Sequence, residues 1–330
     1  MQQHRVAMNV AAIAAVLVAA HASSSVSLHV TAARRTTAPL QTASSTPAAQ
    51  STFQSADLYR LKSVGYVQMS PDGSRIAYSV QNNDRPGRPY SQVWILDLAS
   101  GKAVRLGSDT EAASGPRWSH DGKQIAYFGR EESGAGVVVA RADGSGAALL
   151  APVSGTNHPL PSSGERLAWS PDGRQIAFIS ATAGPETENA NGDPMVITRY
   201  LYKPTASEGL TRFNDNRRLH VFVVDIASKT VRQLTSGDYY EHSIEWSPEG
   251  GDILFVSNHE SDPDRFFNYD IFAANTGSGD VRRLTNTRNA EYRPVWSPNG
   301  KMVAYLGTTR SLTSSETTME DTHVLSLIHI

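Results

Sequence analysis

A four-residue phrase of the Ser-Pro-Asp-Gly type recurs five times and constrains the fold of this chain more than any other feature. Serine can bond through its hydroxyl at the first position, proline pre-sets φ at the second, aspartate or asparagine suits the third, and glycine closes a tight turn. The copies begin at residues 70, 119, 170, 247 and 297, which gives spacings of 49, 51, 77 and 50. A period near fifty residues indicates an array of one supersecondary unit. The copies read Ser70-Pro71-Asp72-Gly73, Ser119-His120-Asp121-Gly122, Ser170-Pro171-Asp172-Gly173, Ser247-Pro248-Glu249-Gly250 and Ser297-Pro298-Asn299-Gly300.

The segments on both sides of this turn repeat as well. Met69 precedes the first serine, and tryptophan precedes the others: Trp118, Trp169, Trp246 and Trp296. A short apolar run follows each glycine: Ile76–Tyr78, Ile125–Tyr127, Ile176–Phe178, Ile253–Phe255 and Val303–Tyr305. Apolar segments on either side of a tight turn predict a β-hairpin in every repeat.

A second hairpin follows the first in the repeats. Its strands are expected at Val93–Asp97 with Ala103–Leu106, at Val137–Val139, at Val221–Asp225, and at Ile271–Ala273 with Val281–Thr285. Four short strands per unit predict an all-β fold, a β-propeller of four-stranded blades with five repeats visible and the fifth incomplete. A solenoid is the alternative, but leucine-rich and helical repeats lack this four-strand rhythm.

The first 22 residues have the pattern of an export signal. Arg5 supplies a positive charge, Val6–Ala20 is mostly apolar, and Ala20-His21-Ala22 fits a cleavage site between small residues. A membrane anchor is the alternative, although fifteen apolar residues are short for a span. The chain has no cysteine, which is compatible with a periplasmic or secreted protein that needs no disulfides.

A low-complexity segment separates this signal from the first repeat. Residues 23–52 are rich in Ser, Thr, Ala and Pro, so we expect a disordered linker. Ala56–Leu61 is expected to form a short helical turn before the propeller, which we place at residues 53–324. The net charge of −2 favours neither nucleic acid nor acidic membranes as a partner, so no membrane contact beyond export is expected.

The long spacing of 77 residues indicates an insertion in the third repeat. About 28 extra residues fall between its second and third strands, around residues 183–218. Insertions in repeat proteins project from one face, where binding residues concentrate. The candidates for contact with a substrate are Glu186, Glu188, Arg199 and Tyr202. A solvated loop without a function is the alternative.

The fifth repeat breaks off after its second strand. A Ser/Thr-rich loop leads to Asp321–Val324, where a third strand should begin, and Leu325–Ile330 matches no part of the repeat. We therefore expect residues 325–330 to be a non-native tail and the chain to be a fragment. A partial propeller would leave unpaired strand edges, which closed propellers avoid.

The sequence contains no motif for a reaction that we can name. A serine hydrolase would show G-x-S-x-G at a strand-to-helix turn, and this motif is absent, as are Walker and dinucleotide-binding loops. His259–Asp264 lacks the spacing of a calcium loop and is interpreted as a solvated loop. We expect no catalytic residue, no metal and no cofactor in these 330 residues.

Several stretches in order resemble one family over roughly residues 56 to 324. They are Ala56–Val64 running into Val67–Gly73, Thr198–Lys203, Val224-Asp225 through Arg232–Asp238, and Val256–Asp264. This combination is similar to the propeller of bacterial prolyl oligopeptidase-family serine peptidases, the dipeptidyl aminopeptidase and acylaminoacyl-peptidase group. His120 departs from the usual proline of the turn, at a position that accepts most residues.

The resemblance implies a function that the chain cannot perform alone. In that family an α/β-hydrolase domain with a Ser-Asp-His triad follows the propeller, which restricts access so that only peptides or unfolded segments reach the nucleophile. The implied partners are therefore peptide substrates and a C-terminal α/β-hydrolase domain of the same chain. Dipeptidyl members hold the substrate amino terminus with acidic residues, for which Glu186 and Glu188 are candidates by charge and location only.

The main alternative is a propeller without enzymatic activity, such as the TolB-like periplasmic proteins that bind protein partners. Those proteins have a sizeable α/β domain before the propeller, whereas only a low-complexity linker precedes the first repeat here. A stand-alone ligand-binding propeller is a further alternative, for which the sequence offers no set of binding residues.

Overall fold

The computed structural model describes residues 54–157, 164–188, 215–309 and 322–328. The chain divides into two compact units, Met1–Leu58 and Tyr59–Ile330, and every strand of the described residues lies in the second. The predicted helical turn is confirmed as a 3-10 helix, η1 (Ser55–Arg60). The expected signal segment and most of the expected linker lie outside the described residues. No helix in the described ranges is long and apolar enough to span a membrane.

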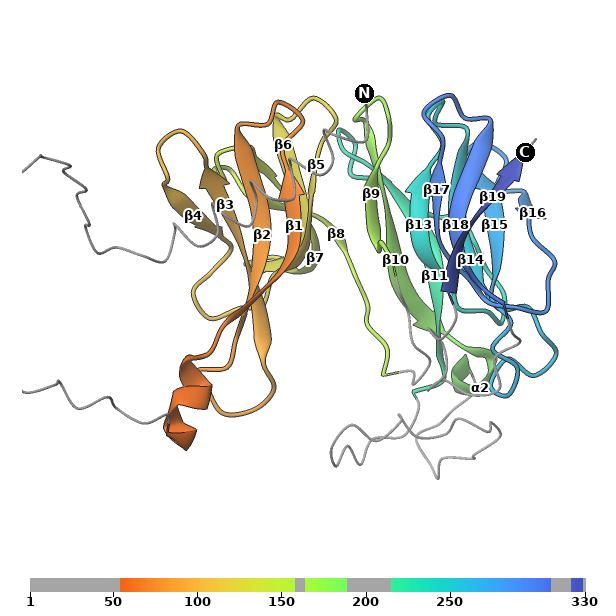
Figure 1. The fold of residues 1–330 in the computed structure, drawn as a ribbon, viewed down its shortest axis with the longest axis horizontal. Helices are drawn as coiled ribbons and strands as arrows, with labels where there is room; N and C mark the ends of the chain where they lie inside the picture. Colours follow the sequence, from red (N-terminus) through yellow and green to blue (C-terminus); the bar gives the residue numbers. More distant parts are fainter. Residues whose placement is uncertain (1–53, 158–163, 189–214, 310–321, 329–330) are drawn as a thin grey trace, which may run out of the picture. The chain divides into compact units, whose positions relative to one another are not determined.

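Five antiparallel sheets follow one another along the second unit, which confirms the predicted β-propeller (Figure 1). The first four blades have four strands each, and the strands of a blade are ordered as in the sequence. Blade 1 contains β1 (Ser63–Met69), β2 (Arg75–Asn82), β3 (Tyr90–Asp97) and β4 (Ala103–Leu106), and blade 2 contains β5 (Ser114–Trp118), β6 (Gln124–Glu131), β7 (Gly134–Arg141) and β8 (Ala148–Pro152). Blade 3 contains β9 (Leu167–Trp169), β10 (Gln175–Ala183), β11 (Arg217–Asp225) and β12 (Val231–Gln233), and blade 4 contains β13 (His242–Trp246), β14 (Asp252–Ser257), β15 (Asp270–Asn275) and β16 (Val281–Arg283).

Blade 5 has three strands in the described residues: β17 (Glu291–Trp296), β18 (Met302–Thr308) and β19 (Thr322–Ile328). The expectation that Leu325–Ile330 fits no blade is wrong as far as Ile328. β19 pairs with β18 along its length, with Leu327 opposite Val303, and Leu327 packs against the apolar core. The pairing extends because Val324, Leu325 and Leu327 continue an apolar strand pattern.

In the described part of the chain the core consists of four clusters, each between two successive blades. Because side chains alternate across a strand, β6 sends Ile125 and Tyr127 toward blade 1 and Ala126 and Phe128 toward blade 3. Two further clusters join blade 3 to blade 4 and blade 4 to blade 5. Both faces of blades 2, 3 and 4 are thus buried against neighbours, which explains why their second and third strands carry apolar residues on both faces.

The tryptophan of the repeat joins one blade to the one before it. Its indole Nε1–H donates a hydrogen bond to the backbone carbonyl of the residue one position before the equivalent tryptophan or methionine. These bonds run from Trp118 to Gln68 (3.3 Å), from Trp169 to Arg117 (3.0 Å) and from Trp246 to Ala168 (3.0 Å). A large apolar ring with one polar edge can fill the space between blades and satisfy a carbonyl there.

The repeated phrase forms the predicted tight turn. In all five copies the glycine N–H donates to the serine carbonyl at 2.9 Å, and the glycine has φ between 67° and 76°. The serine hydroxyl donates to the Asp or Asn side chain in four copies, and its oxygen accepts the N–H two residues beyond the glycine in all five. These bonds fix the turn between the first and second strands of each blade.

The insertion lies between the second and third strands of blade 3. β10 ends at Ala183, a short helix α2 (Pro185–Glu188) follows, and β11 begins at Arg217. Residues 189–214 lie outside the described part of the chain.

Candidate functional site

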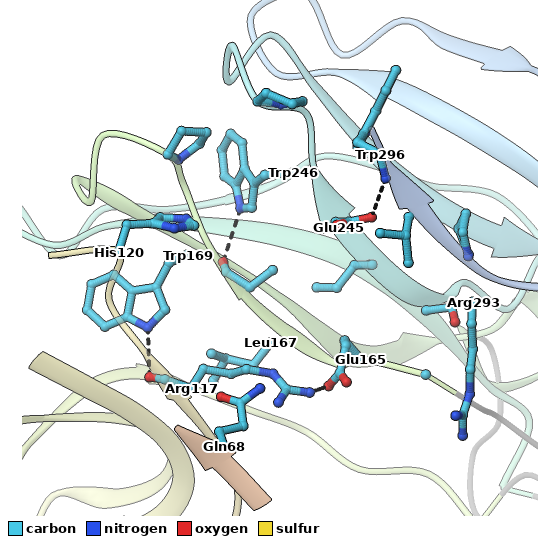
Figure 2. Close-up of a pocket in the computed structure, with 18 of the residues that line it drawn as sticks. Gln68, Arg117, His120, Glu165, Leu167, Trp169, Glu245, Trp246, Arg293 and Trp296 are labelled. Carbon is cyan, nitrogen blue, oxygen red and sulfur yellow. Dashed lines mark hydrogen bonds and ion pairs between the residues drawn. The ribbon is translucent and has the colours of Figure 1, made fainter. Parts of the chain in front are cut away.

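A cavity of about 1100 Å³ is lined by the first strands of all five blades (Figure 2). We call it the shared cavity. Its walls come from β1, β5, β9, β13 and β17, together with the repeated turns and the residues before β9. Its volume lies slightly above the usual range for ligand pockets, about 300–1,000 Å³.

Four of the five first strands contain a β-bulge, and in three of them the bulge aims a side chain into this cavity. The register shifts between Gly65 and Gln68 in β1, and at equivalent places in β5, β13 and β17. The residue three positions before the tryptophan or methionine has positive φ in these strands: Tyr66 (46°), Gly115 (62°), Ser243 (61°) and Arg293 (48°). A bulge bends a strand and re-aims its side chains, and Tyr66, Ser243 and Arg293 all line the cavity.

Arg117 and Glu165 form an ion pair on the cavity wall between blades 2 and 3 (Figure 2). The Arg117 guanidinium also lies 5.4 Å from the centre of the Tyr66 ring. Burial lowers the pKa of Arg117 to about 10, so its guanidinium stays charged at neutral pH. This part of the wall therefore carries one positive and one negative charge and has no net charge.

Glu245 lines the cavity from β13 and accepts a hydrogen bond from the Trp296 backbone N–H at 2.9 Å. Burial raises the pKa of Glu245 to about 7. Between blades 4 and 5 the indole hydrogen bond of the other blades is missing, because the Trp296 indole N–H has no partner among the described residues. The carboxylate of Glu245 thus links blades 4 and 5 where the other seams use an indole.

His120 stands at the rim of the cavity where the other turns have proline. A Cβ atom added at Gly122, Gly250 or Gly300 would contact the proline of the preceding turn. One added at Gly173, which follows the His120 turn, would meet no described atom within 4 Å. In the other turns a proline ring lies beside the glycine of the next turn, whereas the exposed His120 imidazole does not contact Gly173 in this way.

Glu186, the predicted substrate contact whose side chain the structure describes, does not line the shared cavity. The Glu186 carboxylate, in α2, accepts from Nη2 of Arg218 at 2.8 and 3.0 Å, and Arg218 also pairs with Asp238. The Arg218 side chain is 2% exposed and its guanidinium lies 5.2 Å from the centre of the Tyr240 ring. Glu188 is the last residue of α2, whereas Arg199 and Tyr202 lie outside the described residues. Contact of these four residues with a substrate stays a prediction.

The other end of the insertion is also tied to the propeller. Asp215 accepts from the Thr156 hydroxyl at 2.6 Å and from the Asn157 N–H at 3.0 Å, and its own N–H donates to Asn157 Oδ1 at 2.7 Å. An ion pair therefore attaches the start of the insertion to the propeller, and hydrogen bonds attach its end.

A buried glutamate with a polar partner recurs between blades 3 and 4 and between blades 4 and 5. Glu241 bonds to His220 Nδ1 at 2.6 Å, and both side chains are 2% exposed. At the equivalent place Glu291 and Asp270 both contact the Thr285 hydroxyl, at 3.0 and 3.1 Å. Burial is the largest cause that raises the pKa of Glu291, to about 7, with the nearby Asp270 charge adding to it. Burial also raises the pKa of Glu241.

No group of three His, Cys, Asp or Glu side chains in the described ranges is placed to hold a metal ion. In the loop considered for calcium, the His259 ring stacks on Tyr239 at 3.6 Å between ring centres and lies 4.2 Å from Phe272. Burial lowers the pKa of His259 to about 4, so this ring is neutral and acts as an aromatic packing element.

Comparison with known proteins finds similarity to curated peptidases. No protein-family model matches the chain. The uncharacterized peptidase YuxL of Bacillus subtilis (strain 168) is 27% identical over 225 residues, which are 66% of this chain and 33% of that protein. Dipeptidyl-peptidase 5 of Porphyromonas endodontalis is 24% identical over 219 residues, 62% of this chain and 30% of that protein. The chain therefore spans about a third of the length of these curated relatives.

Solved structures share the fold at lower identity. Acylaminoacyl peptidase from Pyrococcus horikoshii aligns with a TM-score of 0.57 and 16% identity, covering 81% of this chain and 38% of that chain. A TolB-type protein from Agrobacterium tumefaciens aligns with a TM-score of 0.50 and 17% identity, covering 81% and 77%. The resemblance predicted from the sequence is confirmed by the curated peptidases, and the solved structures add the fold alone.

Proposed function

We propose that this propeller gates the access of peptides to a Ser-Asp-His peptidase domain of the same polypeptide. The observation that carries this proposal is the sequence similarity to two peptidases along the propeller. The nucleophile, base and orienting acid would all reside in the α/β-hydrolase domain. The apolar N-terminal segment supports export, so the protein would act in the periplasm or outside the cell.

The shared cavity suits a size filter. A folded domain of 100 residues has a radius of gyration of about 13 Å. Such a body cannot enter a cavity of about 1100 Å³, whereas an extended peptide can. The tryptophan, proline and apolar side chains of the wall offer contact to any peptide, while Arg117, Glu165, Glu245 and Arg293 supply the polar contacts. Selection by size would thus come from the backbone of the blades, and selection by charge from a few side chains.

A second function has one observation in its favour. The TolB-type structure is matched over 77% of its length, so the same fold also occurs in a protein that is not named as a peptidase. On this alternative the chain would bind a protein partner in the cell envelope and have no catalytic domain.

The coding sequence downstream of the Val324 codon distinguishes the two functions. The peptidase proposal requires the frame to continue through further blades into a G-x-S-x-G motif followed by Asp and His. A stop codon after one or two further blades would refute it and favour the binding propeller.

A further inference from the structure

Glu245 is the one carboxylate on the wall of the shared cavity that has no cation beside it in the described residues. Glu165, the other acidic side chain of the wall, is neutralised by Arg117. Glu245 receives only the Trp296 N–H, and Arg293 points its guanidinium away from it (Figure 2). One lone pair of the Glu245 carboxylate thus accepts a hydrogen bond, but no positive charge balances the carboxylate.

The surroundings of Glu245 make this imbalance costly. Leu167, Ile244 and Val295 line the cavity with it, from three different blades. A carboxylate among apolar side chains loses much of its hydration, and the low local dielectric strengthens any attraction to a cation that approaches. The same loss of hydration disfavours the charged form of Glu245 and raises its pKa.

We propose that Glu245 binds the cationic side chain, lysine or arginine, of a peptide segment that occupies the shared cavity. The aliphatic stem of such a side chain packs on an apolar wall while its charged end seeks a carboxylate. The ion pair would form on the strand that also anchors the blade 4–blade 5 seam. This inference rests on the proposed function only in taking the cavity as a path for peptides.

A metal ion is a poorer occupant for this site. Divalent cations need several oxygen, nitrogen or sulfur ligands, and Glu245 is the sole free carboxylate on the described wall. An ammonium or guanidinium group needs one carboxylate and can leave its other donors to water or backbone carbonyls.

Peptide binding to the 330-residue chain tests the proposal without any peptidase assay. The probes are Ac-Ala-Ala-Lys-Ala-Ala-NH2, its arginine analogue and its norleucine analogue, which keeps the apolar stem and removes the charge. Calorimetric titration should give about tenfold tighter binding for the lysine and arginine peptides than for the norleucine peptide. In Glu245→Gln, whose amide oxygen can still accept the Trp296 N–H, the three peptides should bind alike. Equal binding to the unaltered chain, or no binding, would overturn the inference.

Arg293→Gln is the matched control, because it changes a charged cavity residue on the next blade. Arg293 has the same charge as the basic side chain of the peptide, so its removal should leave the preference for basic peptides unchanged or larger. A loss as large as that in Glu245→Gln would show that the preference does not arise at Glu245.

Carbodiimide coupling covers the case in which Glu245→Gln fails to fold. This reagent joins an amine directly to a carboxylate, and the lysine peptide should be recovered on Glu245 of the unaltered chain by mass spectrometry. Recovery only on other carboxylates would refute the site. A failed search for the catalytic domain would leave both measurements valid, since neither depends on hydrolysis.

Discussion

At the scale of single residues, an indole hydrogen bond to the preceding blade explains the tryptophan before the repeated turn in blades 2, 3 and 4. Trp169→Phe keeps an aromatic ring but removes the donor to the Arg117 carbonyl. We expect it to lower the free energy of unfolding by about 1–3 kcal/mol, because a buried carbonyl is left without its partner. Urea denaturation followed by circular dichroism measures this change.

Trp296→Phe is the control for that prediction. Its indole N–H has no partner among the described residues, so the same replacement removes ring volume but no hydrogen bond. An equal loss of stability in both variants would show that the tryptophans act by packing alone.

A second prediction at this scale concerns the ion pair at the start of the insertion. Glu186→Gln leaves Arg218, which is 2% exposed, with one anionic partner fewer. We expect a loss of about 1–3 kcal/mol in unfolding free energy, as for a buried charge that loses a hydrogen-bonded partner. Thermal unfolding of this variant beside Glu188→Gln separates the structural role of Glu186 from a general effect of removing acidic charge.

The same two substitutions test substrate contact in the complete polypeptide. If Glu186 and Glu188 hold the amino terminus of a peptide, the double variant should raise KM for peptides with a free amino terminus more than for acetylated ones. An unchanged ratio of the two KM values would exclude them as the amine anchor.

At the scale of elements, the sequence predicts the strands and turns well because the repeat displays them five times. Alternating apolar residues and the Ser-Pro-Asp-Gly phrase each depend on neighbours close in the chain. The bulges of the first strands could not be predicted, since the residues that adopt positive φ there, Tyr66, Gly115, Ser243 and Arg293, share no chemical type. The Arg117–Glu165 pair was missed because its members belong to different repeats and occupy non-equivalent positions.

The acidic cluster between blades 4 and 5 yields a prediction at the element scale. Glu291 and Asp270 both contact the Thr285 hydroxyl, and Asp270 also pairs with Arg283. Ionisation of Glu291 therefore adds a second buried carboxylate beside a single counter-ion. Glu291→Gln keeps one oxygen to accept from the Thr287 hydroxyl, offers its amide N–H to the Thr285 oxygen, and removes one charge. We expect it to stabilise the protein at pH 8, on the order of 1–3 kcal/mol, and to change little at pH 5. Destabilisation at pH 8 would mean that the carboxylate is needed for packing of the seam.

At the scale of the whole molecule, the shared cavity exists only through all five first strands. No single repeat contains it, and each blade contributes different side chains at equivalent positions: Gln68, Arg117, Ala168, Glu245 and Val295. The repeat therefore specifies the scaffold, while departures between its copies specify the chemistry of the wall. This is why the fold could be predicted from the repeat and the candidate site could not.

The buried acids of the propeller also set how its stability responds to pH. Burial raises the pKa of Glu241, and it raises the pKa of Glu245 and of Glu291 to about 7, above the ordinary value of 4.5. Between pH 4.5 and 7 the folded chain therefore holds protons that the unfolded chain has released, so stability falls as pH rises through this window. The lowered pKa of His259, about 4 instead of 6.5, acts in the opposite sense between these two values, as one group against the three acids. The lowered pKa values of Asp72, Asp121 and Asp172 also act in the opposite sense, but only below about pH 4.

We accordingly expect the midpoint of urea unfolding to be higher at pH 5.5 than at pH 8. Combining Glu291→Gln with Glu245→Gln should flatten this dependence, because both variants remove a group that titrates in the window. The exposed residue Glu249 offers a matched control, since Glu249→Gln alters a surface charge in the turn of blade 4 and should leave the slope unchanged. A midpoint that rises with pH over this range would mean that the buried acids are ionised and compensated in the folded chain, and it would contradict their proposed linkage to folding.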